Sequence, residues 1–207
     1  MNKVISDYDA WAYQYDNNIN PTRDLDKIVT KKVLSKIKFS NVLELGCGSG
    51  KNTQWLIKRS SKLIGLDFSK SMLELARKKV VSKDVTFMKT NLNEKWPVVN
   101  NSFDLATINL TLEHIEILDH IFTSVFMKLQ KNGKCFICEL SPKKQLAGTK
   151  ARFEQNGAEI VLDVFEHSEI DYLQSAKKAG LNLISKKDWF DNESDLPRLI
   201  SFLFEKS

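Results

Sequence analysis

The sequence is poor in the residues that mark fibrous, disulfide-rich and membrane-spanning proteins. Its 207 residues include only 8 glycines, 4 prolines and 3 cysteines, which excludes a collagen-like chain and a small disulfide framework. It contains no run of about 18 apolar residues, the length that a membrane-spanning helix needs. The N-terminal residues are polar and aromatic and lack the apolar segment of a secretory signal. We therefore expect a cytoplasmic protein with no membrane partner.

Charged residues are abundant, and neither sign dominates. The chain has 31 Lys and Arg against 26 Asp and Glu, a formal net charge of +5. A basic balance can indicate nucleic acid or another anionic partner. Here charges of both signs alternate and no long basic run occurs, which favours an ordinary solvated surface and leaves nucleic acid as an alternative partner. Hydrophobic residues make up 42% of the chain, enough for a globular core.

The cysteines predict buried thiols rather than a metal or redox site. Cys135 and Cys138 have the CxxC spacing, but no second such pair and no matching histidine pair follows. Both lie in the apolar run GKCFICEL, which is typical of a buried strand. We expect no metal site.

Apolar residues alternate between helical and extended periodicity along the first two thirds of the chain. Strands are expected at 42–45, 62–67, 85–89, 103–109 and 134–140, and helices at 22–38, 50–60, after Ser69, and 112–129. This alternation predicts parallel strands joined by crossover helices. Short apolar strands indicate a sheet covered on both faces.

The last third of the chain follows a different pattern. A helix is expected from Ser168 to about Gly180, with Asp171 in its first turn and His167 as a satisfied loop residue. The apolar stretches 183–190 and 197–205 predict a terminal β-hairpin. The segment 143–166 has no regular pattern and is expected over the ligand side of the sheet.

The strongest site signal is VLELGCGSG at 42–50, a strand that ends in a glycine-rich turn before a helix. Such a turn uses glycine because a Cβ would block the close approach of a ligand to the backbone. Asp67 ends the next strand, so both features lie at one edge of a parallel sheet. A carboxylate at that place can accept hydrogen bonds from both hydroxyls of a ribose. The pattern therefore implies a nucleoside-bearing ligand.

The charge beside the turn separates two classes of nucleoside ligand. Glu44 stands two residues before Gly46, where a carboxylate suits a cationic ligand and opposes a pyrophosphate. The turn is GxGxG rather than the dinucleotide pattern GxGxxG, and GxxxxGK[ST] is absent. S-adenosylmethionine carries an ammonium, a carboxylate and a sulfonium, so this turn favours it over a dinucleotide.

Residues 42–53, VLELGCGSGKNT, resemble motif I of the class I S-adenosylmethionine-dependent methyltransferases. Four further segments occur in the order of that family: LIGLDFSKSML (63–73), VTFMKTNLN (85–93), SFDLATINLTLEHI (102–115) and LQKNGKCFICELSP (129–142). The resemblance implies an α/β, Rossmann-like, doubly wound sheet of seven strands, mostly parallel with an antiparallel last strand, and with helices on both faces.

The resemblance also divides the chain into parts of one domain, 1–207. Residues 8–16 resemble the segment that folds over the cofactor in many small-molecule methyltransferases, so 1–21 are expected to form a lid. Residues 22–142 would form the cofactor-binding core. Residues 143–207 would contribute the acceptor side and the terminal hairpin. In the lid, Tyr8, Tyr13 and Tyr15 could cover the cofactor or form a packed aromatic patch.

Individual cofactor-binding roles follow from the same resemblance. Glu44 and the backbone of Gly46, Cys47 and Gly48 would hold the methionine end of S-adenosylmethionine. Asp67 would bind its ribose.

The adenine would lie against Phe68 and Met72, two residues that also suit plain core packing. Asn91 and Leu92 would bind the adenine edge, although many relatives have Asp where this chain has Asn91. We expect weaker but retained binding from the Asn carbonyl oxygen.

The remaining roles concern the methyl-transfer region. Asn109 and Leu110 follow the fourth strand, where a backbone carbonyl of the family meets the cofactor's ammonium. His114, expected on the next helix, and Tyr15 of the lid are the candidate bases and thus the candidate catalytic residues, and Tyr15 would also contact the cofactor. For His114, a structural role within LEHI is the alternative.

The sequence therefore predicts in-line transfer of a methyl group from S-adenosylmethionine to oxygen or nitrogen of a small-molecule acceptor. It shows no RNA-binding module, and Asn109-Leu110-Thr111-Leu112 stands where an NPPY-type motif would mark amino-group methylation of nucleobases and amides. Methylation of RNA or protein is one alternative, and a non-catalytic scaffold that binds S-adenosylmethionine is another. Monomer and homodimer both stay open, as does the acceptor.

Overall fold

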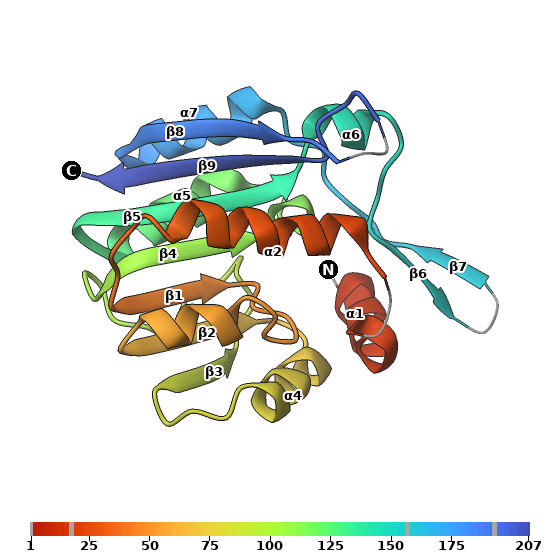
Figure 1. Ribbon diagram of the computed structural model, residues 1–207, viewed down its shortest axis with the longest axis horizontal. Helices are drawn as coiled ribbons and strands as arrows, with labels where there is room; N and C mark the ends of the chain where they lie inside the picture. Colours follow the sequence, from red (N-terminus) through yellow and green to blue (C-terminus); the bar gives the residue numbers. More distant parts are fainter. Residues whose placement is uncertain (1, 17–18, 156–157, 192–193) are drawn as a thin grey trace.

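A seven-stranded sheet forms the centre of the computed structural model, which describes residues 2–16, 19–155, 158–191 and 194–207. The strands lie in the order β3-β2-β1-β4-β5-β9-β8 (Figure 1). Their bounds are β1 Asn41–Leu45, β2 Lys62–Asp67, β3 Val85–Lys89, β4 Phe103–Asn109, β5 Leu129–Leu140, β8 Leu181–Trp189 and β9 Leu199–Lys206. Strands β1 to β5 pair in parallel, whereas β9 runs antiparallel to both β5 and β8. The predicted fold class is confirmed.

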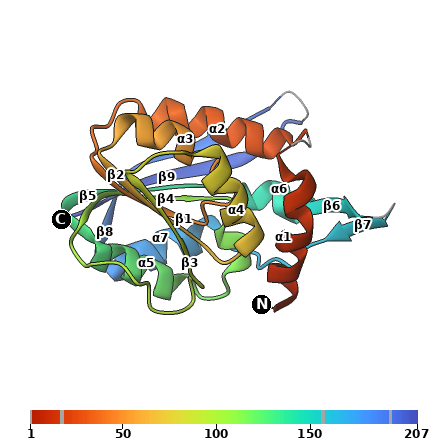
Figure 2. The ribbon, with the colours of Figure 1, turned by 90° about the horizontal axis from the view of Figure 1, so that it is seen from below.

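Helices cover both faces of this sheet. One face carries α2 (Pro21–Leu34), α3 (Thr53–Leu56) and the 3-10 turn η1 (Ile57–Arg59). The other carries α5 (Leu118–Lys128) and α7 (Glu169–Ala179), as Figure 2 shows from the side. A separate buried apolar cluster fills each interface. The two layers leave the carboxyl ends of the parallel strands uncovered by crossover helices, and the site forms there.

Capping residues set the helix starts that the sequence indicated. The Ser69 hydroxyl accepts a hydrogen bond from the Met72 N–H at the start of α4 (Lys70–Lys79). Ser168 and Asp171 form a capping box at the start of α7, and Gly180 ends that helix with φ of 91°. The predicted helix at 168–180 and the predicted terminal hairpin, β8 with β9, are both confirmed. Cys135 and Cys138 are buried, unbridged thiols on β5, as predicted.

The predicted helix over 112–129 is wrong, because this segment is broken in two. A 3-10 turn, η2 (Leu112–His114), comes first, and α5 begins only at Leu118. The buried Glu139 carboxylate accepts hydrogen bonds from the N–H groups of Thr111 and Leu112 and holds the chain at the end of β4. The Ile115 carbonyl bonds to the His167 ring at 2.7 Å rather than to a helical partner. Tertiary hydrogen bonds thus override a continuous apolar pattern.

Two other predicted helices are shorter than their patterns indicated. The helix expected at 50–60 is reduced to α3 and η1, because the glycine turn closes on itself with the Gly50 N–H bonded to the Cys47 carbonyl. The helix expected to reach residue 38 ends at Leu34. Strand β5, in contrast, starts at Leu129, well before the expected residue 134.

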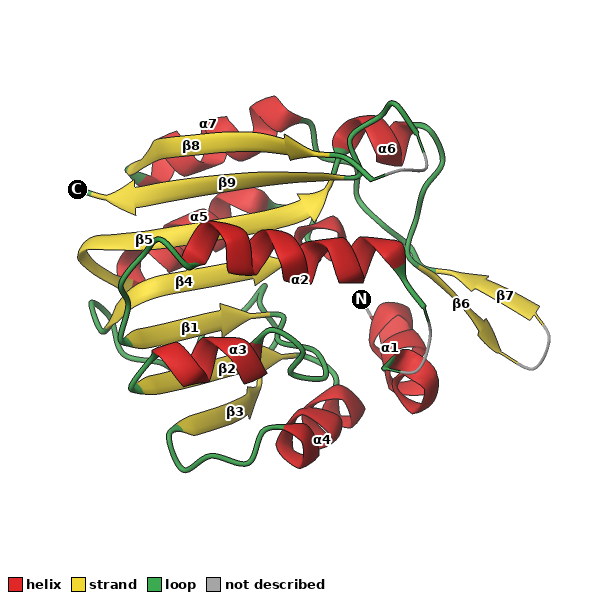
Figure 3. Cartoon of the chain, viewed as in Figure 1, coloured by secondary structure: helices red, strands yellow, loops and turns green. Residues whose placement is uncertain are grey.

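The segments outside the core gather at the ligand edge of the sheet. Helix α1 (Asn2–Tyr15) lies across the carboxyl ends of the strands, and the hairpin of β6 (Arg152–Gln155) and β7 (Ala158–Val161) extends beside it (Figure 3). With α6 (Pro142–Leu146), this hairpin gives regular structure to a segment that was expected to be irregular. Among the described residues, no helix is long and apolar enough to cross a membrane, and no three side chains are grouped as metal ligands.

Candidate functional site

The glycine turn after β1 is held by β2 and leaves one side open. The N–H groups of Gly46 and Cys47 both donate to the Leu66 carbonyl. Gly46 has φ of +67°, and a Cβ there would lie 2.1 Å from the Thr111 hydroxyl oxygen. Gly48 has φ of +51°, and a Cβ there would have no atom within 4 Å. The two glycines therefore serve different needs: Gly46 permits packing against Thr111, and Gly48 keeps the backbone accessible from the cavity.

Asp67, at the end of β2, joins the two strand ends. Its carboxylate accepts hydrogen bonds from the Gly48 N–H at 2.8 Å and from the Ser69 N–H at 2.9 Å. Burial raises the pKa of Asp67 to about 6, and these backbone hydrogen bonds oppose the rise. The sequence prediction that this acid and the glycine turn share one edge is confirmed by this contact.

Glu44 is a buried acid on β1 that faces the same space. The Thr53 hydroxyl donates to its Oε2 at 2.5 Å, and no cation pairs with it among the described residues. Burial raises the pKa of Glu44 to about 8, and the charges of Asp26 and Asp67 raise it further. A bound cation would reverse that shift, because it stabilises the ionised carboxylate.

Helix α2 adds an acid that sequence reasoning missed. Asp26 accepts hydrogen bonds from the Asn109 amide at 2.6 Å and from the Asn52 amide at 2.9 Å. Burial raises the pKa of Asp26, and these amide hydrogen bonds oppose the rise. Asp26 occupies an ordinary polar position in its helix, and nothing in the sequence indicated that it would be buried beside β4.

Cations line the same space as these acids. The Arg23 guanidinium lies 4.0 Å from the centre of the Tyr15 ring and donates to the Tyr15 carbonyl. Lys51 follows the glycine turn and pairs with the exposed Asp24 at 2.7 Å. Sequence reasoning also missed both cations as site residues, since a lone Arg or Lys on a helix or loop is usually a surface group.

These residues surround what we call the central cavity, of about 80 Å³. The predicted site residues that line it are Tyr15, Glu44, Gly46, Cys47, Gly48, Asp67, Phe68, Met72, Asn109, Leu110 and His114. Asn91 and Leu92 do not line it. They border a neighbouring large cavity of about 400 Å³, which shares the walls formed by Phe68, Thr111 and His114. The Asn91 amide there donates to Glu94 at 2.8 Å, and its oxygen accepts from the Asn93 N–H.

Tyr8 of α1 lines the central cavity beside the walls that it shares with the large cavity. Its hydroxyl lies 2.9 Å from His114 Nε2, and its ring packs edge-on against Phe68 at 5.5 Å between centroids. Burial lowers the pKa of His114 to about 4, so its imidazole is neutral at pH 7. His114 lies on η2, not on the expected long helix. The Tyr13 side chain lies outside the described residues.

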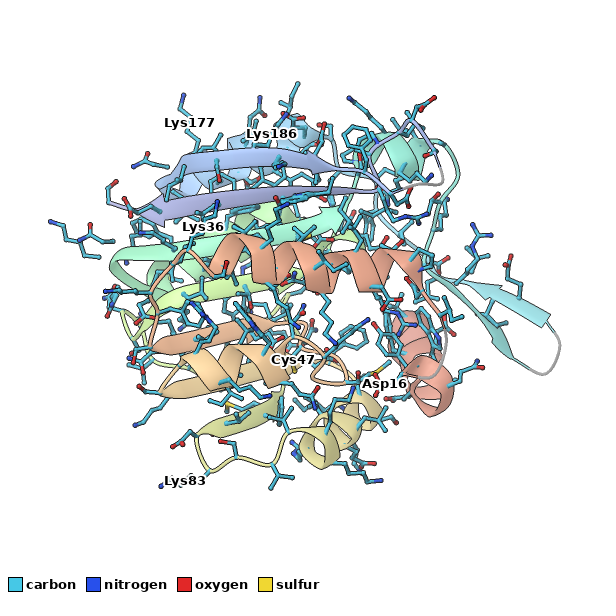
Figure 4. The ribbon with its side chains drawn as sticks, in the orientation of Figure 1. Asp16, Lys36, Cys47, Lys83, Lys177 and Lys186 are labelled. Carbon is cyan, nitrogen blue, oxygen red and sulfur yellow. The ribbon has the colours of Figure 1, made fainter. Side chains whose placement is uncertain are left out.

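Polar contacts attach the middle of α1 and the residue after its C-terminal end to the core. Asp9 accepts hydrogen bonds from the Ser69 hydroxyl at 2.6 Å and from the Ser71 N–H. Asp16, which Figure 4 labels close to the Cys47 loop, accepts from the Ser49 hydroxyl and pairs with Lys79 at 2.6 Å. The N-terminal segment thus covers the central cavity by specific contacts with the glycine turn and with the start of α4.

Comparison with known proteins adds a family to this geometry. Residues 43–137 match the family model described as a methyltransferase domain. A demethylmenaquinone methyltransferase of Lactobacillus johnsonii is 33% identical over 121 residues, which cover 54% of this chain and 49% of that protein. One from Lactococcus lactis subsp. lactis is 31% identical over 149 residues, covering 68% of this chain and 57% of that protein. The chain thus spans about half the length of these curated relatives.

The solved structures extend the likeness to the whole fold. The N-methyltransferase NodS from Bradyrhizobium japonicum, in complex with S-adenosyl-L-homocysteine, superposes with a TM-score of 0.75 over 98% of both chains, at 14% identity. At that identity the likeness concerns the fold. Over residues 43–137 the chain is therefore similar to the methyltransferase domain, and its fold is that of solved S-adenosylmethionine-dependent methyltransferases.

Proposed function

We propose that this protein transfers a methyl group from S-adenosylmethionine to oxygen or nitrogen of a small-molecule acceptor. The observation that carries the proposal is the mixed charge of the central cavity, which buried acids and two cations line beside a glycine turn. A zwitterionic amino acid joined to a ribose matches that arrangement, and a pyrophosphate does not, because three buried carboxyls would repel it.

The amino-acid end of the cofactor fits the two signs of charge. Glu44 and Asp26 would accept hydrogen bonds from the ammonium, which would also favour ionisation of their carboxyls. Arg23 and Lys51 would bind the carboxylate. The backbone of Cys47 and the neighbouring glycines would lie alongside this amino-acid end of the cofactor.

The nucleoside end would extend toward the large cavity. Asp67 would bind the ribose, with Phe68 and Met72 against the base and Asn91 with Leu92 at its edge. The central cavity, of about 80 Å³, is smaller than the roughly 300–1,000 Å³ of ordinary ligand sites, so its lining residues would have to move apart for the cofactor to bind.

Bound S-adenosylmethionine supplies an activated methyl group and leaves as a neutral thioether. The residues of this chain would contribute mainly alignment and the exclusion of water. Positioning of this kind can lower a barrier by about 7–11 kcal/mol. Helix α1 closes the site over the glycine turn, and its half-buried Tyr8 and buried Trp11 make that side largely apolar. His114 is neutral at pH 7 and already engaged with Tyr8, so it is a weaker candidate base than its sequence position indicated.

The curated relatives favour a small molecule over RNA or protein as the acceptor. Their names include small-molecule substrates, demethylmenaquinone among them.

Calorimetry with S-adenosylhomocysteine and S-adenosylmethionine tests the cofactor. We expect both to bind, and no detectable binding at millimolar concentration would contradict the proposal. Methyl-labelled cofactor, added with protein to a cell extract, then tests the acceptor class. The label should enter a small molecule that survives nuclease and protease digestion. Label that becomes soluble only after nuclease treatment would indicate RNA instead.

A further inference from the structure

A third cavity lies on the other side of Tyr8 and Arg23. It is bounded by α1 and α2, by Glu113 of η2 and by residues 149–152, which lead into β6. We call it the basic cavity. It shares Tyr8, Tyr15 and Arg23 with the central cavity, so a group bound there would be next to the methionine end of the proposed cofactor.

Cations outnumber acids around the basic cavity. Arg23 lines its inner wall, and Lys150 and Arg152 line its mouth, against the single acid Glu113. Arg152 also pairs with Glu159 at 3.4 Å, but both side chains are about half exposed, and such surface pairs contribute little. The cavity therefore favours an anionic group and disfavours an amine that is protonated at neutral pH.

Aromatic rings form the remaining wall. Tyr8, Trp11 and Tyr15 pack against one another, with the Trp11 and Tyr15 rings 4.9 Å apart. The Arg23 guanidinium lies over this cluster, 5.5 Å from the Trp11 ring. A flat, apolar ligand body suits such a surface, because aromatic side chains pack well against planar groups.

Glu113 is an acid on the wall of the basic cavity whose hydrogen bonding is incomplete. Glu113 is only 8% exposed, and its Oε2 is buried without a hydrogen-bond partner among the described residues. Its Oε1 lies 3.8 Å from His114 Nε2. A buried carboxyl oxygen without a partner is costly, and a ligand hydroxyl could satisfy it.

The surroundings of Glu113 keep its proton affinity high. Burial raises its pKa to about 7. The titratable groups that interact with it are Tyr8 of α1, His114 beside it, Glu139 of β5 and Tyr172 of α7, none of which is a cation at pH 7. The cations of the basic cavity face it only from across that space. A proton acceptor that titrates near neutral pH suits general-base chemistry.

On the basis of the proposed function, we propose that the basic cavity is the acceptor site and that it takes a small aromatic acid whose hydroxyl group hydrogen-bonds to Glu113. The acceptor's anionic group would face Lys150 and Arg152. Its ring would lie against the aromatic wall. The nucleophile would then be oxygen rather than nitrogen.

The proposed step balances in atoms and charge. The acceptor oxygen forms a bond to the methyl carbon while its O–H bond breaks, and the proton passes to the ionised Glu113 carboxylate. The electron pair of the broken S–CH₃ bond stays on sulfur, which becomes a neutral thioether. Glu113 then returns the proton to solvent.

Binding experiments test the class of ligand without requiring turnover. The protein, saturated with S-adenosylhomocysteine, is titrated with 4-hydroxybenzoate, with the neutral 4-hydroxybenzamide of nearly the same shape, and with benzoate, which lacks the hydroxyl. We expect the acid to bind about tenfold or more tightly than the amide at pH 7. The double variant Lys150→Gln/Arg152→Gln should bring the two affinities together. Lys83→Gln, an exposed cation remote from α1, is the matched control and should not change their ratio.

The pH dependence tests Glu113 itself. The affinity of 4-hydroxybenzoate relative to benzoate should rise by up to about tenfold between pH 6 and pH 8, as the carboxyl ionises and accepts the hydroxyl proton. In Glu113→Gln the ratio should be flat, while the affinity for S-adenosylhomocysteine stays within about twofold of the original.

The outcomes separate this inference from the proposed function. Failure of S-adenosylhomocysteine to bind would overturn both. Normal binding of that compound with equal affinities for the acid and the amide, or with no binding of either, would overturn the anionic acceptor class alone. If the double variant still bound the acid more tightly than the amide, the acceptor site would have to lie elsewhere. A pH-independent ratio in the unmodified protein would remove Glu113 from the mechanism.

Discussion

The central cavity and the basic cavity lie on two sides of Tyr8 and Arg23, yet the chain builds them differently. Glu44, Asp67 and Asn109 of the central cavity stand at the ends of adjacent parallel strands, whose register fixes their spacing. The walls of the basic cavity come mostly from α1, α2, η2 and residues 149–152, which belong to no strand of the large sheet, and Leu140 at the end of β5 also lines it. A cofactor site shared by a family can therefore stay constant while the neighbouring site varies.

The largest effect is expected at Gly46, in the glycine turn of the central cavity. In Gly46→Ala the new Cβ would lie 2.1 Å from Thr111 Oγ1 at a positive φ, so backbone must move. We expect a loss of about 3 kcal/mol or more in the free energy of unfolding, measured by urea denaturation. Gly48→Ala is the matched control, since its Cβ meets open space, and should cost only about 1–2 kcal/mol for its left-handed conformation while it weakens S-adenosylhomocysteine binding. Equal losses in the two variants would contradict the different roles of these glycines.

The second prediction concerns the buried acids of the central cavity. The folded-state pKa values of Glu44 and Asp67 lie near 8 and 6, above their usual 4.5 and 3.8, so the folded protein binds more protons than the unfolded chain between about pH 4 and pH 8. Stability of the ligand-free protein should therefore fall as pH rises through that window, by an amount on the order of a few kcal/mol. Thermal melts at a series of pH values check this. Glu44→Gln should flatten the upper part of the curve, and an unchanged slope would show that Glu44 is ionised in the folded protein.

A smaller effect is expected at Asp67, the acid proposed to bind the ribose. Asp67→Asn keeps one acceptor oxygen but removes the negative charge. In the unmodified protein the charged carboxylate accepts hydrogen bonds from the Gly48 and Ser69 N–H groups. We expect S-adenosylhomocysteine to bind about 1–3 kcal/mol more weakly, measured by calorimetry. Asp119→Asn is the control, because that carboxylate pairs with Lys178 at the surface of α5 and α7. Unchanged affinity in the Asp67 variant would mean that the ribose is bound elsewhere.

The smallest effect is expected at Tyr8, which lines both the central cavity and the basic cavity. Tyr8→Phe keeps the packing against Phe68 and removes the hydrogen bond to His114. The loss is expected to be about 1 kcal/mol, which corresponds to roughly fivefold faster amide exchange in α1 by mass spectrometry. Exchange in α5 serves as the internal reference. If exchange in α1 did not change, the Tyr8–His114 contact would not be what holds the helix closed.

The predictable part of this protein is the part with local patterns. Glu44, the glycine turn and Asp67 could be assigned to one edge because β1 and β2 are short apolar runs that each end in a recognisable residue. Ser69 and Ser168 gave correct helix starts for the same reason. Asp26, Arg23 and Glu113 escaped detection, since each occupies an ordinary position in its own segment and becomes a site residue only through partners far along the chain.

The broken helix at residues 112–129 shows the same limit in the fold. Its apolar spacing fits one continuous helix, but Glu139 and His167 hold residues 111–115 in another conformation. Local periodicity and capping suffice to specify the order of strands and helices, the glycine turn and the acids at the strand ends, because these depend on residues close together in the chain. The division of the site by Tyr8, the burial of Glu113 and the gathering of cations beside α1 arise only in the folded chain, since they depend on which distant segments pack together.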